Sequence, residues 1–418
     1  MMKLPRAAFV SQRTIWVILI IVTGLALRAA AISAFNHTPE SDELAYQSMA
    51  LNLVSGNGIV DSMGNHAMYN VGYPLFIVAP VFALFGENLF VARILNALLG
   101  AVAIGLCYAI AKEAGAGKTG QLLAAGMWAL YLPSSIYTVY LLKENLMAPL
   151  MLGVIWCVLR LLKAPSYPTA LCCGVLLGLL ALTGNAALSL AAPAVLALAF
   201  TPANLGRKLS LSMLILVSAV LVTTPWIARN MRVLGAPILN TNAGFNLYLG
   251  NNPAATGMFV SIADTPRGQT WDKLRKEGEV RASEVLKVEA VAWIKEHPAT
   301  FLTLAFKKAA YFWTPPFHEG KGPSSSIETI VRVLWAIQFV VLVIGAIGSL
   351  FITSLRSRHL AVLWLAIASY TAVHMLFYVI FRYREPIMPL VCVLAALGIE
   401  SVWVRCRHTP DRSDLAKP

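Results

Sequence analysis

Long apolar runs recur along most of this chain, from Thr14 to Val404. A helix needs about 20 predominantly apolar residues to cross a bilayer, and unpaired backbone amides are costly in hydrocarbon. The pattern therefore predicts an all-α polytopic membrane protein with about ten spans. The predicted spans cover 14–35, 88–111, 119–138, 144–162, 169–184, 186–201, 209–228, 327–354, 360–380 and 386–404.

Two longer and more polar segments interrupt this series. Basic residues flank the spans at alternate ends, which is the positive-inside pattern and puts both polar segments on the outer side. The predicted organisation is an N-terminus with the first span, a first outer loop, a transmembrane bundle, a second outer segment, C-terminal spans and a cytoplasmic tail. These parts cover residues 1–35, 36–87, 88–228, 229–326, 327–404 and 405–418.

The first outer loop contains two predicted interfacial pieces. Ser41 is of a type that caps helices, and apolar positions between Tyr46 and Val54 recur at helical spacing. A helix with one apolar face would lie along the membrane surface. Residues 73–85 are apolar but too short to cross, so we predict a second interfacial or re-entrant piece.

The second outer segment contains a charged stretch and an apolar stretch. Residues 271–297 read as a charged helix. Residues 299–313 are apolar but include Lys307 and Lys308, so an interfacial helix is favoured over a span.

Composition supports the bilayer as solvent. The chain is 58% hydrophobic and 13% charged, a balance outside the usual range of soluble domains. The formal charge of +13 could indicate a nucleic-acid partner, but the basic residues flank spans instead of clustering on a soluble module, so none is predicted. The histidines show no metal-ligand spacing, so no metal site or cofactor is predicted, and the assistance of a divalent metal stays open.

Candidate chemistry lies in charged groups at the outer ends of the spans. The first outer loop contains Glu40, Asp42, Glu43, Asp61 and Glu87 and no lysine or arginine. Acidic residues at a helix N-terminus have a structural explanation, because the helix dipole favours them. Cations near the outer membrane surface can likewise snorkel or pair locally. Several of them opposite an acidic loop suit a site that binds an anion beside a carboxylate base. These cations are Arg28, Arg93, Lys143, Arg229, Arg382 and Arg384.

An ordered set of motifs resembles the GT-C glycosyltransferases, in the bacterial ArnT-like and protein O-mannosyltransferase-like (glycosyltransferase family 39-like) branch. The first is the run from Pro39 to Tyr46 that contains Ser41-Asp42-Glu43. Later matches are Tyr73-Pro74, Ala92-Arg93, Pro225 to Asn230, Asn246 to Pro253 and Arg382 to Pro386. The chain departs from many relatives at Leu182-Thr183-Gly184-Asn185, where they have an arginine after Leu-Thr.

The resemblance implies a membrane glycosyltransferase that moves a sugar from a polyprenyl-phosphate donor to an acceptor with inversion. It implies a bacterial inner membrane, an active site on the periplasmic side, and a glycan, lipid or protein acceptor. Asp42 is expected to be the general base and Glu43 its partner. The expected donor-phosphate ligands are Arg382, Arg384, Arg93, Lys143 and Arg229. The expected substrate-loop residues are Tyr46, Tyr248, Asn251 and Asn252.

Two other classes stay open at this point. A lipid-linked glycan flippase or transporter would also need cations at membrane depth, but should show internal repeats or broken mid-membrane helices. An O-antigen ligase or polymerase would be expected to use basic residues and histidines of a large outer loop. The sequence names neither the sugar, the acceptor nor the oligomeric state.

Overall fold

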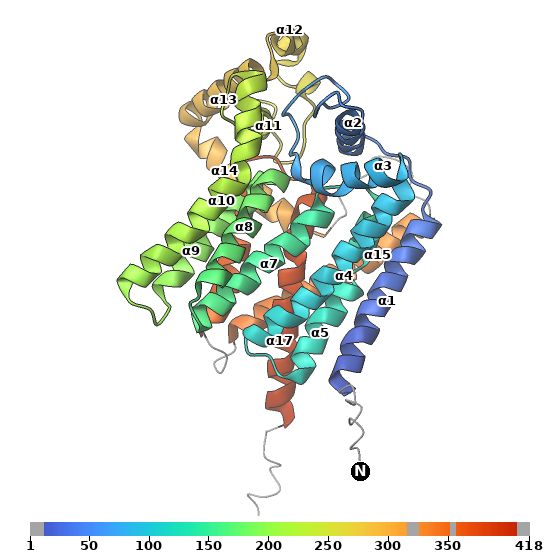
Figure 1. Cartoon of the computed structure of the whole chain (residues 1–418), viewed down its shortest axis with the longest axis vertical. Helices are drawn as coiled ribbons and strands as arrows, with labels where there is room; N and C mark the ends of the chain where they lie inside the picture. Colours follow the sequence, from blue (N-terminus) through green and yellow to red (C-terminus); the bar gives the residue numbers. More distant parts are fainter. Residues whose placement is uncertain (1–11, 316–325, 352–356, 408–418) are drawn as a thin grey trace, which may run out of the picture.

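The computed structural model describes residues 12–315, 326–351 and 357–407. Within these ranges the regular elements are helices, and one isolated bridge joins Met258 to Val379. Figure 1 shows long helices running side by side, with shorter helices gathered at one end of the bundle. The predicted fold class, an all-α membrane protein, is confirmed.

Six described helices are long and apolar enough to cross a membrane. They are α1 (Gln12–Ala34), α4 (Leu89–Glu113), α7 (Glu144–Lys163), α10 (Leu205–Leu234), α15 (Ser326–Gly348) and α17 (Met388–Arg407), the last two with their 3₁₀ extensions η6 (Ser349–Phe351) and η7 (Phe381–Ile387). A bent pair, α5 (Lys118–Ala129) and Leu132–Val139, adds a seventh if both belong to one span. The pair is α5 followed by α6 (Leu132–Ile136) and η2 (Tyr137–Val139), with a 52° bend.

Shorter helices occupy the remaining predicted spans. These are α8 (Tyr167–Thr183), η3 (Asn185–Leu190) with α9 (Ala191–Ala199), and α16 (Ser357–His374). Helical structure therefore overlaps every predicted span, although residues 352–354 of the span 327–354 lie outside the described part of the chain and α16 ends at His374, before the predicted end at 380. The count of ten stays a prediction because several of these pieces are short or broken.

The outer segments fold into the group of short helices. The first contains α2 (Asp42–Val54), η1 (Pro74–Val78) and α3 (Ala79–Phe85). The second contains α11 (Asn242–Gly250), η4 (Ile262–Asp264), η5 (Gly268–Thr270), α12 (Trp271–Lys276), α13 (Glu279–Glu296) and α14 (Pro298–Phe312). The charged helical stretch predicted over 271–297 is divided into α12 and α13, because the chain breaks at Gly278, whose φ of 102° does not fit a helix. Residues 316–325 of this segment lie outside the described part of the chain.

Ser41 precedes α2, but the predicted side-chain cap is wrong. Its φ is 52° and its side chain accepts no capping hydrogen bond. A non-glycine residue in that region costs on the order of 1–3 kcal/mol and is retained where the surroundings impose it. The strained residue stands directly before the first residue of α2, Asp42.

Close packing of α8 against α10 depends on glycine. A methyl group on Gly174 would overlap the Ser218 hydroxyl and the Ile215 carbonyl oxygen. Small residues at such contacts let membrane helices approach closely, and packing replaces the hydrophobic effect as the driving force there.

We expect Gly174→Ala to lower the free energy of unfolding by about 1–3 kcal/mol, because the two helix backbones must separate. Gly126→Ala is the matched control, since Gly126 faces open space and alanine is the better helix former. Thermal unfolding of both variants in detergent checks this. Equal unfolding temperatures would contradict the packing argument.

Candidate active site

Three elements, α2, α7 and η7, meet at one ion pair. Arg382, in η7, pairs with the carboxylate of Asp42. The Arg382 Nε atom lies 3.6 Å from Oε1 of Glu144, the first residue of α7. Asp42 and Arg382 keep 24% and 20% of their side-chain surface exposed, whereas Glu144 keeps 4%. The site therefore joins an accessible carboxylate, a bridging guanidinium and a buried second carboxylate.

Glu43 holds α2 in place from the opposite side. Its Oε1 accepts a hydrogen bond from the Leu141 amide at 2.7 Å, and its Oε2 lies 2.5 Å from His37 Nε2. Arg93 fixes the same segment, because it donates to the carbonyls of His37 at 2.5 Å and Val139 at 2.8 Å. Both predicted site residues thus bond to the scaffold that positions Asp42.

Arg384 lies close to Arg382 in sequence but bonds elsewhere. Its guanidinium donates to the carbonyls of Phe312 at 3.1 Å and Thr314 at 2.6 Å. It also lies 4.1 Å from the ring centroid of Phe339, and the residue is fully buried. Its contacts therefore connect η7 to the end of α14.

Arg229 and Tyr46 are also tied to neighbouring structure. Arg229 donates to the carbonyls of His66 and Ile59, each at 2.8 Å. Tyr46 is 1% exposed and packs its ring 5.8 Å from Tyr69. The Arg229 bonds join the first outer loop to α10. The Tyr46 ring packs α2 against the same loop.

The three predicted substrate-loop residues after Asn246 close the end of α11. Asn251 donates to the Leu376 carbonyl at 2.7 Å and accepts from Lys308 Nζ at 3.0 Å. Asn252 donates to the carbonyl of Tyr248 at 2.8 Å, and all three residues are buried. Their bonds hold the loop to α14 and to the segment that follows α16.

Burial lowers the pKa of Lys308 to about 8, below its usual value. The folded protein then loses this proton at lower pH than the unfolded chain, so stability should rise between pH 8 and 9.5, by up to ~3 kcal/mol at full deprotonation. Thermal unfolding measured from pH 7 to 9.5 checks the slope. Lys308→Met should flatten it, and an unchanged slope in that variant would refute the assignment to Lys308.

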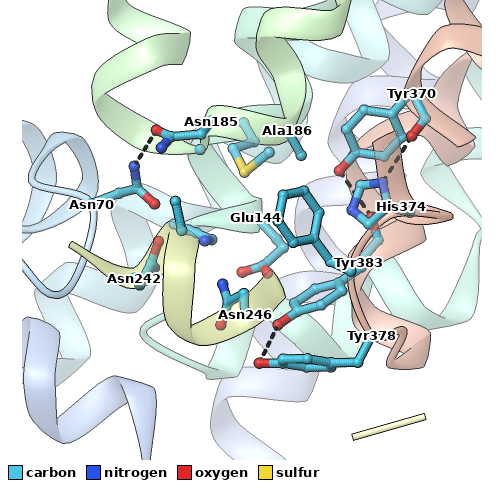
Figure 2. A pocket seen from close by; sticks show the side chains of 15 residues that line it. Asn70, Glu144, Asn185, Ala186, Asn242, Asn246, Tyr370, His374, Tyr378 and Tyr383 are labelled. Carbon is cyan, nitrogen blue, oxygen red and sulfur yellow. Dashed lines mark hydrogen bonds between the residues drawn. The ribbon is translucent and has the colours of Figure 1, made fainter. Parts of the chain in front are cut away.

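A cavity of about 100 Å³ opens beside Glu144. Figure 2 shows the Glu144 carboxylate among side chains from α11, η3 and the end of α16. Asn70 donates to Asn185 at 2.9 Å, and Tyr383 donates to the Tyr378 hydroxyl at 3.1 Å. The polar lining is Asn70, Lys143, Glu144, Asn185, Asn242, Asn246, Tyr370, His374, Tyr378 and Tyr383. This lining offers a cation, a carboxylate and several neutral donors to one ligand.

Glu144 is a candidate site residue because its carboxylate is buried and one of its oxygens is unpaired among the described residues. Its Oε2 atom is buried and has no hydrogen-bond partner in the described part of the chain. Buried carboxylates without full hydrogen bonding are costly and need an explanation. The sequence predicts Glu144 at the start of a membrane span. Its contact with Arg382 joins residues far apart in the chain, so the spacing of residues in the sequence could not predict it.

The asparagines of the cavity are also missing from the sequence-based site. Asn242 and Asn246 are four residues apart, so they share one face of α11. Gly184 and Asn185 line the same cavity, at the position where the resemblance expects an arginine. The cavity wall there is consequently neutral.

Arg382 lines a second opening, of about 330 Å³. Its wall combines Tyr137, Tyr140, Leu142 and Ile380 with the polar residues Glu40, Ser41 and Glu43. Arg382 therefore lines this mixed opening and contacts Glu144, which lines the polar cavity.

The comparisons with known proteins give one family match. Residues 73–228 match the family model described as dolichyl-phosphate-mannose-protein mannosyltransferase. The segment contains Lys143, Glu144 and Asn185 but neither Asp42 nor Arg382. Among curated proteins, no sequence matches this chain.

Solved structures of AglB, an oligosaccharyltransferase from Archaeoglobus fulgidus, share the fold. The complex with an inhibitory peptide and a dolichol-phosphate has a TM-score of 0.56 at 13% identity, over 94% of this chain and 50% of that chain. The form tethered to an acceptor peptide has a TM-score of 0.55 at 14% identity, over 96% of this chain and 52% of that chain. The chain has the GT-C fold. It spans about half the length of these AglB chains.

One further GT-C likeness is weaker. ArnT from Cupriavidus metallidurans, bound to undecaprenyl phosphate, is 16% identical over 93% of this chain and 78% of that chain, with a TM-score of 0.44. The resemblance to the GT-C superfamily is confirmed through the family match and the AglB fold.

Proposed function

We propose that this GT-C protein is a membrane glycosyltransferase whose donor is a sugar linked to a polyprenyl phosphate. The observation that carries the proposal is the Asp42–Arg382 ion pair beside buried Glu144, at the outer edge of a membrane bundle. A carboxylate and a guanidinium that stay partly exposed there can meet an acceptor hydroxyl and a lipid phosphate. The AglB complex contains a dolichol-phosphate, and the matching family is described as dolichyl-phosphate-mannose-protein mannosyltransferase, which supports the same donor chemistry.

Asp42 acts as general base in the proposed reaction. It removes the proton of an acceptor hydroxyl as that oxygen attacks the anomeric carbon of the donor sugar. The bond from this carbon to the phosphate oxygen breaks, and the phosphate leaves with the electron pair. Attack opposite the leaving group inverts the anomeric centre.

Arg382 and Lys143 stabilise the departing phosphate. Negative charge grows on that group as the bond breaks, and fixed cations in a partly dry site lower the barrier most. Arg382 lines the second opening and contacts Glu144, which lines the polar cavity together with Lys143. In this scheme the lipid lies along the apolar wall of the second opening, and the polar cavity receives the sugar.

Glu144 and Glu43 have different proposed roles. Glu144 orients Arg382 and offers its unpaired Oε2 to a sugar hydroxyl. Glu43 is a positioning residue, since both of its oxygens bond to the scaffold around α2. Its proposed contribution is to keep Asp42 in place.

The proposed location is a bacterial inner membrane with the site on the periplasmic side. Sugars attached to nucleotides are not available there, so the activated bond must arrive on a lipid. The positive-inside pattern around the spans supports this orientation.

The testing experiment uses the purified full chain in lipid vesicles with radiolabelled polyprenyl-phosphate sugars and a mixture of glycan, lipid and peptide acceptors. We expect labelled sugar to move to an acceptor while free polyprenyl phosphate accumulates. Turnover of nucleotide sugars alone would refute the proposed donor. Movement of intact donor across the bilayer without bond cleavage would favour a flippase instead.

A further inference from the structure

A second cleft, of about 220 Å³, lies in the outer part of the molecule. Its walls come from the first outer loop and from α11, α12 and α13, which Figure 1 shows grouped at one end of the bundle. None of these elements is among the candidate membrane spans. The residues that line the cleft include Asn65, Tyr69, Phe245, Trp271, Arg275 and Glu279.

The walls of this cleft are held together by Glu279. Its Oε1 accepts from the His66 amide at 2.7 Å, and its Oε2 accepts from the Ala67 amide at 3.1 Å and the Thr241 hydroxyl at 2.8 Å. Thr241 also donates its amide to the Ala67 carbonyl at 2.8 Å. Both carboxylate oxygens of Glu279 are thus used internally, and the cleft is preformed.

The cleft and the polar cavity beside Glu144 lie against neighbouring faces of α11. Thr241 and Phe245 line the cleft, whereas Asn242 and Asn246 line the cavity. The first outer loop repeats the arrangement, because Tyr69 faces the cleft and Asn70 the cavity. A molecule held in the cleft is therefore one helix away from the proposed reaction.

The cleft combines aromatic surface with a few polar groups. The rings of Trp271 and Phe245 lie 5.4 Å apart at an interplanar angle of 47°. Tyr69 adds a third ring, and exposed Arg275 supplies hydrogen-bond donors. The Asn65 amide nitrogen donates to the Asp61 carboxylate at 2.9 Å, so Asn65 offers its Oδ1 atom as an acceptor. Such a mixture is typical of sites for small organic ligands. The volume would hold on the order of seven waters, which is close to one sugar ring.

We infer that this cleft binds a sugar ring of the acceptor, an inference that rests on the proposed transferase function. The C–H face of a pyranose packs against an aromatic ring, its hydroxyl or acid groups take hydrogen bonds from Arg275, and a hydroxyl donates to Oδ1 of Asn65. The acceptor is then a saccharide whose end reaches past α11 to Asp42. A lipid chain is a poorer occupant, since the cleft lies outside the candidate spans.

Binding can be measured without donor, so this inference and the transferase activity can fail separately. The full chain in lipid nanodiscs is screened by saturation-transfer NMR against soluble hexose, hexosamine and pentose disaccharides. We expect at least one disaccharide to bind with its ring C–H protons most saturated, and Trp271→Ala to weaken it at least tenfold. Trp293→Ala is the matched control, because Trp293 is also partly buried, on α13, but stacks on His297 outside the cleft.

A second variant keeps the test decisive if Trp271→Ala does not fold. Arg275 is exposed, so Arg275→Ala should fold and still weaken the bound disaccharide several-fold. Absence of any bound disaccharide, or equal affinity in the folded cleft variants and wild type, would overturn the inference. Binding of aromatic peptides in place of sugars would overturn it as well.

Discussion

Replacing Asp42 by Asn should reduce transfer of sugar from the polyprenyl-phosphate donor by about 10²–10⁴-fold. The amide keeps the shape of the side chain but does not accept the proton of the acceptor hydroxyl. The pair with Arg382 is partly exposed, so loss of its charge should cost at most ~1 kcal/mol of stability. The measurement is the rate of labelled sugar transfer with saturating donor, next to thermal unfolding of the same sample.

Asp264→Asn is the control for this variant. Asp264 is an exposed carboxylate of the second outer segment and lines neither opening of the proposed site. It should transfer sugar at the wild-type rate. If Asp42→Asn retained more than a tenth of wild-type turnover, Asp42 would not be the base, and buried Glu144 would be the next carboxylate to test.

The membrane fold could be predicted because the bilayer imposes it on the sequence. A run such as Leu89–Glu113 has one stable state in hydrocarbon, a helix, so its limits follow from apolar length. The break between α5 and α6 was not predicted. Local turn geometry at Leu130 and Tyr131, with the 52° bend, depends on packing that apolar content does not encode.

The site could be predicted only in part. The acidic first loop and the last outer turn indicated Asp42 and Arg382, residues that prove to be in contact. Arg384 was grouped with Arg382 because the two are near neighbours in sequence. They lie in the 3₁₀ helix η7, where three residues make a turn and side chains two apart leave on different sides. The face of α11 that lines the cavity could not be predicted either, because Asn242 and Asn246 come to line the same cavity as Glu144 only in the folded bundle.

Arg382→Gln is expected to lower transfer by about 10²–10³-fold, because the departing phosphate loses a fixed charge at the site. Affinity for polyprenyl phosphate should also fall about tenfold, whereas Asp42→Asn should leave that affinity nearly intact. Arg382→Lys should recover part of the loss as a point charge without the planar fork. Binding of labelled polyprenyl phosphate and initial transfer rates separate the two effects.

Arg384→Gln is the comparison variant for Arg382→Gln. Arg384→Gln should lower thermal stability strongly, since its fully buried guanidinium bonds the carbonyls of Phe312 and Thr314. Arg382→Gln should lose most of its turnover and lower the unfolding temperature less than Arg384→Gln does, because its own guanidinium is partly exposed, although buried Glu144 loses a cationic partner. Because Asp42 and Arg382 would act as one unit, the double variant should lose less than the product of the two single losses. Full additivity would mean that the ion pair is a structural contact and that the base and the phosphate site lie apart.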